Sequence, residues 1–177
     1  MRGKRQEYLF VDGYNIINSW ESLKELKDLD LESARDKLMD ILAEYKHYSG
    51  IKIVLVFDAH MVKGNSGTEI DYKGLKVVYT KESDTADHYI ERQLNELGKI
   101  KRVRVATSDW MEQQIILGRG GTRISARELE IEIFDEKNAI ERQNKVDKGK
   151  NDFTMGQLDK SIVDKLNSFL NKDDTLD

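Results

Sequence analysis

Aspartates stand at or near the ends of the apolar segments of this chain. Five of them share this position: Asp12, Asp58, Asp84, Asp87 and Asp109. If the apolar segments are parallel strands, their carboxyl ends meet at one edge of the sheet, where ligands bind in open α/β folds. Carboxylates gathered there repel one another unless a divalent cation neutralises them or some are protonated. Oxygen ligands favour Mg²⁺ or Mn²⁺, which activates water for attack on a phosphodiester.

Each aspartate also has a purely structural interpretation. Asp12, followed by a glycine, is compatible with a tight turn, although no partner strand for a hairpin follows it. Asp84 and Asp109 stand where N-terminal helix caps are expected. Asp58 can simply begin a loop. Together these interpretations do not account for acids after so many apolar segments, so the cluster carries the prediction.

Polar and basic side chains supply candidate partners for a phosphate. Asn15 lies three residues after Asp12, in a segment expected to be a loop over the sheet edge. Its amide can orient a water or a phosphate oxygen, or it can complete a turn. Arg119, Arg123 and Arg127 lie in a glycine-containing segment that enters a helix. Such a segment is a candidate phosphate-binding site, because helix N-termini and arginine side chains both favour anions; the alternative is a solvated basic face.

Apolar patterning predicts the elements that position these residues. Short apolar segments predict strands at 8–11, 51–57, 75–79 and 103–107. Helical spacing predicts helices at 31–45 (closed by Gly50), 86–97, 109–117, from Ser125 toward Asn144, and a short one at 158–170. The polar segment 60–71, with two glycines, predicts a loop. Alternating strands and helices predict an α/β fold with a parallel sheet covered on both faces.

Composition narrows the class of protein. The chain has 177 residues, 38% hydrophobic and 35% charged, which suits a globular domain. The absence of cysteine excludes disulfides and thiolate metal sites. No apolar run is long enough to span a membrane and no signal peptide is recognisable, so we expect a cytoplasmic protein without a membrane partner. The net charge of −4 does not exclude a nucleic-acid partner, because bases gather locally.

Five short segments resemble a known domain in their order and spacing. They are FVDGYN at 10–15, VFDAH at 56–60, TKESDTAD at 80–87, ATSD at 106–109 and SAREL at 125–129. The first four resemble the NYN domain, a branch of the PIN-like nuclease superfamily. The last resembles the closing helix of its bacterial YacP-like subgroup. The resemblance covers about residues 8–145 and, within the subgroup, is greatest to the ribosome-associated A-site endoribonucleases of Gram-positive bacteria.

The resemblance implies a fold, a site and an activity. The fold is a three-layer α/β/α sandwich with a parallel central sheet, formed by a nuclease domain at 1–145 and followed by a polar C-terminal extension with a short helix at 146–177. The metal-binding set is Asp12, Asp87 and Asp109, with Asp84 and Asp58 as secondary members. Asn15 is the polar companion of the first acid. The activity is Mg²⁺- or Mn²⁺-dependent endoribonuclease cleavage of single-stranded RNA, with mRNA and the translating ribosome as partners.

Two other classes of function compete with the nuclease. One is a non-catalytic RNA- or ribosome-binding adaptor that keeps the fold and binds through Arg119, Arg123 and Arg127. The other is a phosphatase or phosphotransfer domain, also built on strand-end aspartates. The Asp-x-Asp pair of haloacid-dehalogenase phosphatases is missing, because Tyr14 stands where the second acid would be.

Overall fold

The structure is a computed structural model that describes residues 7–58, 66–97, 102–108, 116, 118 and 121–146. Within them, one sheet contains β1 (Glu7–Asp12), β2 (Lys52–Phe57), β3 (Ser66–Tyr72), β4 (Leu75–Lys81), β5 (Arg102–Ala106) and β6 (Thr122–Ile124). The helices are α1 (Gly13–Ser19), α2 (Glu21–Leu29), α3 (Leu31–Ser49), α4 (Ala86–Leu97) and the C-terminal helix at 126–146. The chain divides into two units between Glu136 and Lys137, and the whole sheet belongs to the first.

The sheet is mostly parallel, with the strand order β3-β4-β2-β1-β5-β6. Strands β1, β2, β4, β5 and β6 all pair in parallel, and β3 pairs antiparallel to β4 at one edge. The predicted α/β fold is therefore confirmed. Because the five parallel strands point the same way, their carboxyl ends lie along one edge of the sheet.

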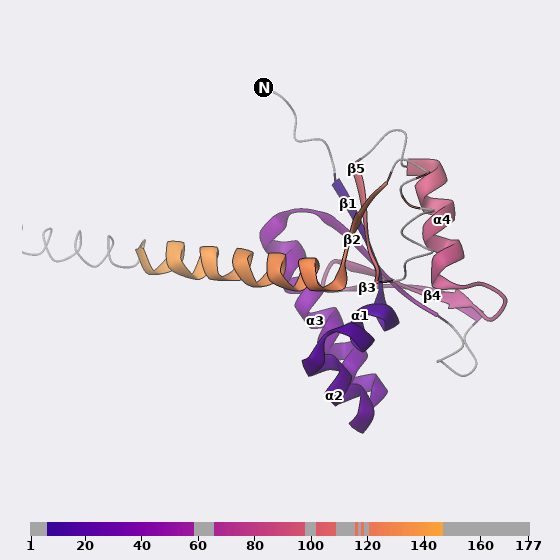
Figure 1. Cartoon of the computed structure of the whole chain (residues 1–177), viewed down its shortest axis with the longest axis horizontal. Coiled ribbons are helices and arrows are strands. Elements are labelled where there is room, and N and C mark those ends of the chain that lie inside the picture. The colour runs from indigo at the N-terminus through magenta and orange to yellow at the C-terminus, as the bar shows by residue number, and fades with distance from the viewer. Residues whose placement is uncertain are drawn as a thin grey trace, which may run out of the picture. The chain divides into compact units, whose positions relative to one another are not determined.

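Side chains that alternate along the central strands build two separate cores. On β1, Leu9 and Val11 face the core beneath α1, α2 and α3, whereas Phe10 faces the core beneath α4. On β2, Leu55 and Val54 divide in the same way. Figure 1 shows α4 on one side of the strands and α1, α2 and α3 on the other. The layers are those of an α/β/α sandwich, and strands buried on both faces explain the continuous apolar run of β2.

Helix α3 ends where its predicted counterpart does. The side chain of Asp30 caps its start by accepting hydrogen bonds from the backbone N–H groups of Glu32 and Ser33, at 3.2 and 3.0 Å. Gly50 closes it in a left-handed conformation with φ of 67°. Because α3 connects two parallel strands, it begins near the carboxyl edge of the sheet and returns the chain to the opposite edge.

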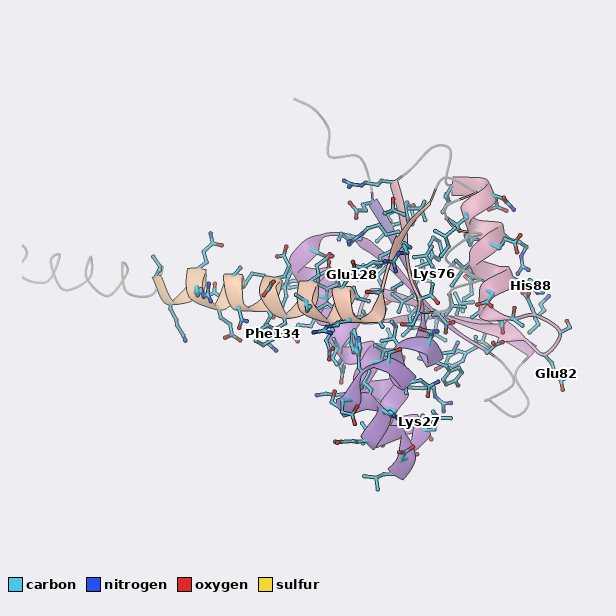
Figure 2. The ribbon with its side chains drawn as sticks, viewed as in Figure 1. Lys27, Lys76, Glu82, His88, Glu128 and Phe134 are labelled. Atoms are coloured by element: carbon cyan, nitrogen blue, oxygen red, sulfur yellow. The ribbon has the colours of Figure 1, made fainter. Side chains whose placement is uncertain are left out.

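Of the predicted loop at 60–71, residues 60–65 lie outside the described residues, and the second half belongs to a hairpin. Residues 66–71 belong to β3, so the loop prediction is wrong over that range. Lys73 and Gly74 form the turn to β4, and both have positive φ, 51° and 81°, as in the two-residue turns that suit twisted hairpins. Across the hairpin, Lys76 Nζ lies 2.8 Å from Glu69 Oε2 (Lys76 is labelled in Figure 2). Polar side chains hid this strand, because an edge strand facing solvent needs little apolar surface.

The C-terminal helix begins directly after Ser125, as its sequence predicts, and the structure shows a reciprocal cap there. The Glu128 backbone N–H donates to Ser125 Oγ at 3.2 Å, and the Ser125 N–H donates to Glu128 Oε2 at 2.7 Å (Glu128 is labelled in Figure 2). Trp20 Nε1 donates to the Ala126 carbonyl at 2.8 Å, which ties this helix to the end of α1. The predicted helix at 109–117 lies outside the described residues except for Ile116, and the one at 158–170 lies wholly outside them. No described helix is long and apolar enough to cross a membrane.

Candidate active site

Asp12 is placed at the junction between β1 and α1. It is the last residue of β1 and the N-cap of α1, where its Oδ1 accepts a 3.1 Å hydrogen bond from the backbone N–H of Asn15. The chain passes from strand to helix at Gly13, whose backbone lies against the ring of Phe57. The alternative of a hairpin turn at Asp12 is therefore wrong, and the carboxylate stands at the carboxyl edge of the sheet.

Three of the predicted acids influence one another at this edge. The pKa of Asp12 is raised to about 6, first because burial penalises its charged form and then because the charges of Asp87 and Asp58 oppose it. Asp58 follows β2, the neighbour of β1, and its Oδ1 accepts a 3.4 Å hydrogen bond from Thr80 Oγ1. Asp87 is exposed in the first turn of α4. The edge thus gathers carboxylates from three separate parts of the fold.

The donor set has the chemistry that a hard divalent cation requires. The Asp12 carboxyl is partly buried, and two further negative charges lie near it. A bound cation would remove the repulsion among these charges and stabilise the ionised form of Asp12. Among the described residues, no three His, Asp or Glu side chains already form a metal-ligand cluster. Asp109 lies outside the described residues, directly after Ser108.

The carboxylate of Asp84 forms a salt bridge with an arginine. Both of its carboxylate oxygens accept hydrogen bonds from Arg92 on α4, one of them at 3.0 Å, and this pairing lowers the pKa of Asp84. The hydroxyl of Thr85 accepts a 3.2 Å hydrogen bond from the backbone N–H of His88 and so caps α4. The capping role considered for Asp84 therefore belongs to Thr85. His88 itself is exposed on α4 (Figure 2).

Asn15 lies in the first turn of α1, not in a loop as predicted. Its Oδ1 accepts a 2.7 Å hydrogen bond from the backbone N–H of Ser108, which follows β5. A second link runs beside it, because Ser19 Oγ lies 3.3 Å from Ser108 Oγ and donates to the Asn15 carbonyl at 2.8 Å. Asn15 thus joins the segment after β1 to the segment that leads into Asp109.

The predicted basic residues divide between described and undescribed parts of the chain. Arg123 is exposed on β6, and Arg127 is exposed in the first turn of the C-terminal helix. Because β6 runs parallel to β5, the start of this helix lies at the same edge of the sheet as Asp12. Arg119 lies outside the described residues.

Sequence reasoning missed a cluster of aromatic rings and one arginine that follows Asp12, on the face of the sheet that α3 covers. The ring of Phe57 packs against the rings of Tyr14 and Tyr79, with centroid separations of 5.1 and 5.5 Å. Arg35 Nη1 on α3 donates to the Tyr14 hydroxyl at 3.1 Å. The only available signal was Tyr14 itself, next to the Asp12-Gly13 pair; Arg35 reads as an ordinary polar residue of an amphipathic helix.

Comparisons with known proteins agree on one group. The family described as the YacP-like NYN domain matches residues 9–171. The Bacillus subtilis (strain 168) protein YacP, described as uncharacterized, is 44% identical over 138 residues, which cover 77% of this chain and 81% of YacP. A crystal structure of Rae1 (YacP) from Bacillus subtilis has a TM-score of 0.68 at 38% identity, covering 94% of this chain and 95% of that one. The structure of a tryptophan-to-leucine mutant of Rae1 has a TM-score of 0.66 at 42% identity, covering 77% and 80%.

Proposed function

The chain belongs to the YacP-like NYN domain family, as its sequence motifs indicated, and from this we propose that it is a metal-dependent endoribonuclease that cleaves single-stranded RNA. The observation that carries the proposal is the coupling of Asp12 with Asp87 and Asp58 at the carboxyl edge of the sheet. Family membership supports a nuclease class and RNA as the partner. The residues at the edge support the more specific chemistry.

Asp12, Asp87 and Asp58 are the described residues that would hold Mg²⁺ or Mn²⁺, with Asp109 as the further ligand that the family pattern implies. A bound ion would activate water and stabilise the charge that develops on the phosphodiester. Asp12 is held in place because it also caps α1, so its carboxylate cannot rotate freely. Asn15 acts as a positioning residue through Ser108. Asp84 serves α4 through Arg92 instead of binding the ion.

The RNA strand would reach this edge along basic side chains. Arg127, at the start of the C-terminal helix, and Arg123, on β6, are both exposed to solvent. Guanidinium groups bind phosphates without reading base sequence, which suits a nuclease that acts on varied messages. We further propose that the physiological substrate is mRNA on the translating ribosome in the cytoplasm, a proposal that rests on the resemblance described above.

The test is cleavage by the wild-type protein and by Asp12→Asn. Asparagine keeps the helix cap, so the variant should fold normally while Mg²⁺- or Mn²⁺-dependent cleavage falls at least about 100-fold. Mapping RNA 5′ ends on ribosomes with each protein should show cuts only with the wild type. Undiminished cleavage by a folded Asp12→Asn protein would refute the assignment. RNA or ribosome binding without metal-dependent cleavage would favour the adaptor function instead.

A further inference from the structure

A partly buried arginine lies on the α3 side of the carboxylate edge. Arg35 donates from Nη1 to the Tyr14 hydroxyl, and Tyr14 and Tyr79, both partly exposed, pack on the buried ring of Phe57. We call Tyr14, Arg35 and Tyr79 the arginine corner. Two tyrosine rings that rest on a buried phenylalanine restrict the space in which the Arg35 side chain can move.

The arginine corner begins two residues after Asp12, the central candidate metal ligand. Tyr14 follows Asp12 by two residues, so their Cα atoms are at most about 7.6 Å apart. Arg35 lies in the second turn of α3, and α3 begins near the edge at which β1 ends. The hydrogen bond to Tyr14 holds the guanidinium near that same edge, on the face of the sheet that α1, α2 and α3 cover.

Arg35 differs from Arg92 and Arg104 in the groups that it bonds. Arg104 pairs with Glu132 and Glu7, and Arg92 pairs with Asp84. Arg35 forms no ion pair with a carboxylate of the described residues, although Glu32 is near enough to act on its charge. A guanidinium has five N–H donors, and here a neutral hydroxyl takes one of them. A positioned cation with donors to spare is suited to a phosphate, which it can grip with two parallel hydrogen bonds.

We propose that Arg35, oriented by the Tyr14 hydroxyl, binds a backbone phosphate of the RNA strand next to the scissile one. This inference rests on the proposed nuclease function, which supplies the scissile phosphate at the carboxylates. In this arrangement the RNA strand crosses the end of β1. The cleaved phosphate lies at Asp12, and the neighbouring phosphate lies at Arg35 on α3. This site recognises the backbone and not the bases.

RNA binding can be measured without cleavage, in Asp12→Asn protein with a chelator present. The probe is a fluorescein-labelled single-stranded oligouridylate, followed by fluorescence anisotropy over a range of salt concentrations. Arg35→Gln should raise Kd about tenfold, because a charge-assisted hydrogen bond is lost. It should also reduce the slope of log affinity against log salt by about 0.7, the value for one phosphate contact on a single strand. Tyr14→Phe should raise Kd less and leave the slope unchanged.

Lys37→Gln is the matched control. It removes one positive charge from the same helix, about 200° around the axis from Arg35, and Lys37 is exposed. If Arg35→Gln and Lys37→Gln bind the probe equally well, with the same salt slope, the inference is overturned. Arg35→Lys keeps the charge without the planar fork and should bind with an intermediate Kd, which separates a phosphate contact from loss of folding.

The two proposals fail in different ways. If the wild-type protein cleaves RNA but Arg35→Gln binds normally, only the arginine corner is refuted. If Arg35→Gln weakens binding but the wild-type protein never cleaves RNA with Mg²⁺ or Mn²⁺, the nuclease function is refuted and the phosphate contact stands.

Discussion

The side chain of Asn15 links α1 to the end of β5, because its Oδ1 accepts a 2.7 Å hydrogen bond from the backbone N–H of Ser108. Residues 93 positions apart in the sequence are thereby held together beside Asp12. Ser108 immediately precedes Asp109 in the sequence, so the bond restrains the residue before the last acid that the family pattern implies. We propose for Asn15 a positioning role that needs no contact with substrate.

We therefore expect Asn15→Ala to impair catalysis more than stability. Loss of one partly exposed hydrogen bond should lower the free energy of unfolding by about 1 kcal/mol. The rate of RNA cleavage at saturating substrate should fall, while Kd for RNA changes little. Asn18→Ala is the control, because Asn18 is exposed on the same helix and its side chain bonds only Lys27, at 2.7 Å, among the described residues. Equal cleavage rates for the two variants would contradict the positioning role.

The raised pKa of Asp12 predicts how stability depends on pH. In a chelator, the folded protein keeps the Asp12 proton up to about pH 6, whereas the unfolded chain releases it near its ordinary value of 3.8. The protonated Asp12 side chain therefore contributes to the free energy of unfolding in full below about pH 4, and this contribution is lost as the pH rises through 6. The free energy of unfolding should fall by about 1–3 kcal/mol over this range. Chemical denaturation of wild type and Asp12→Asn at pH 4 and pH 8 isolates this contribution, because the other acids are shared.

The same comparison has a clear contrary outcome. Asp12→Asn should be more stable than the wild type at pH 8, since it removes an unfavourable charge but keeps the cap. A variant that is less stable than the wild type at pH 8 would show that the Asp12 charge stabilises the fold, opposite to our expectation.

Divalent cations should relieve the repulsion among the carboxylates at the sheet edge and so stabilise the folded protein. Adding millimolar Mg²⁺ or Mn²⁺ to chelator-treated protein should raise Tm by a few degrees, because an ion that binds only the folded state stabilises it. Asp12→Asn and Asp87→Asn should each lose most of this rise in a thermal denaturation experiment. An equal rise in wild type and both variants would indicate non-specific ion binding. Asp36→Asn, an exposed acid on α3, serves as the charge-matched control.

Substitutions of Asp84 and Asp87 should differ sharply in their effect on RNA cleavage, although the two residues are only three positions apart. Asp84 is paired with Arg92, so Asp84→Asn should keep cleavage activity within about tenfold of wild type and lower stability by up to about 1 kcal/mol. Asp87→Asn should reduce cleavage at least about 100-fold with stability maintained. Steady-state cleavage rates for both variants decide the matter, and the reverse ranking would move the metal site toward Asp84.

Gly13 should tolerate no side chain. A Cβ there would lie 2.3 Å from Phe57 Cε1, inside the buried core. Gly13→Ala should therefore lower the free energy of unfolding by about 1–3 kcal/mol, the usual cost of overpacking. Gly118→Ala should be nearly neutral, since no atom of the described residues lies within 4 Å of a Cβ added there. Adding Phe57→Leu to Gly13→Ala should restore part of the lost stability, and a failure to do so would locate the strain elsewhere.

Strong local signals made part of this fold predictable. The buried strands β1, β2, β4 and β5 were evident because a strand covered on both faces must be apolar along its length. Helices α3 and α4 and the start of the C-terminal helix were evident from apolar spacing and from end signals such as Gly50 and Ser125. Elements whose stability depends on their neighbours were not evident. β3 is polar and pairs only at an edge, and β6 is three residues long.

The sequence alone determined which residue types were available for chemistry, and motif order determined the family to which they belong. Only the tertiary structure decided how they are used. Burial at the end of β1, together with the nearby charges of Asp87 and Asp58, raises the pKa of Asp12, and Arg92 forms a salt bridge with Asp84. Only the packing of α3 on the sheet brought Arg35 to Tyr14. The physical reason is that charge and hydrogen-bond energies depend on distances through space, which spacing along the chain does not specify.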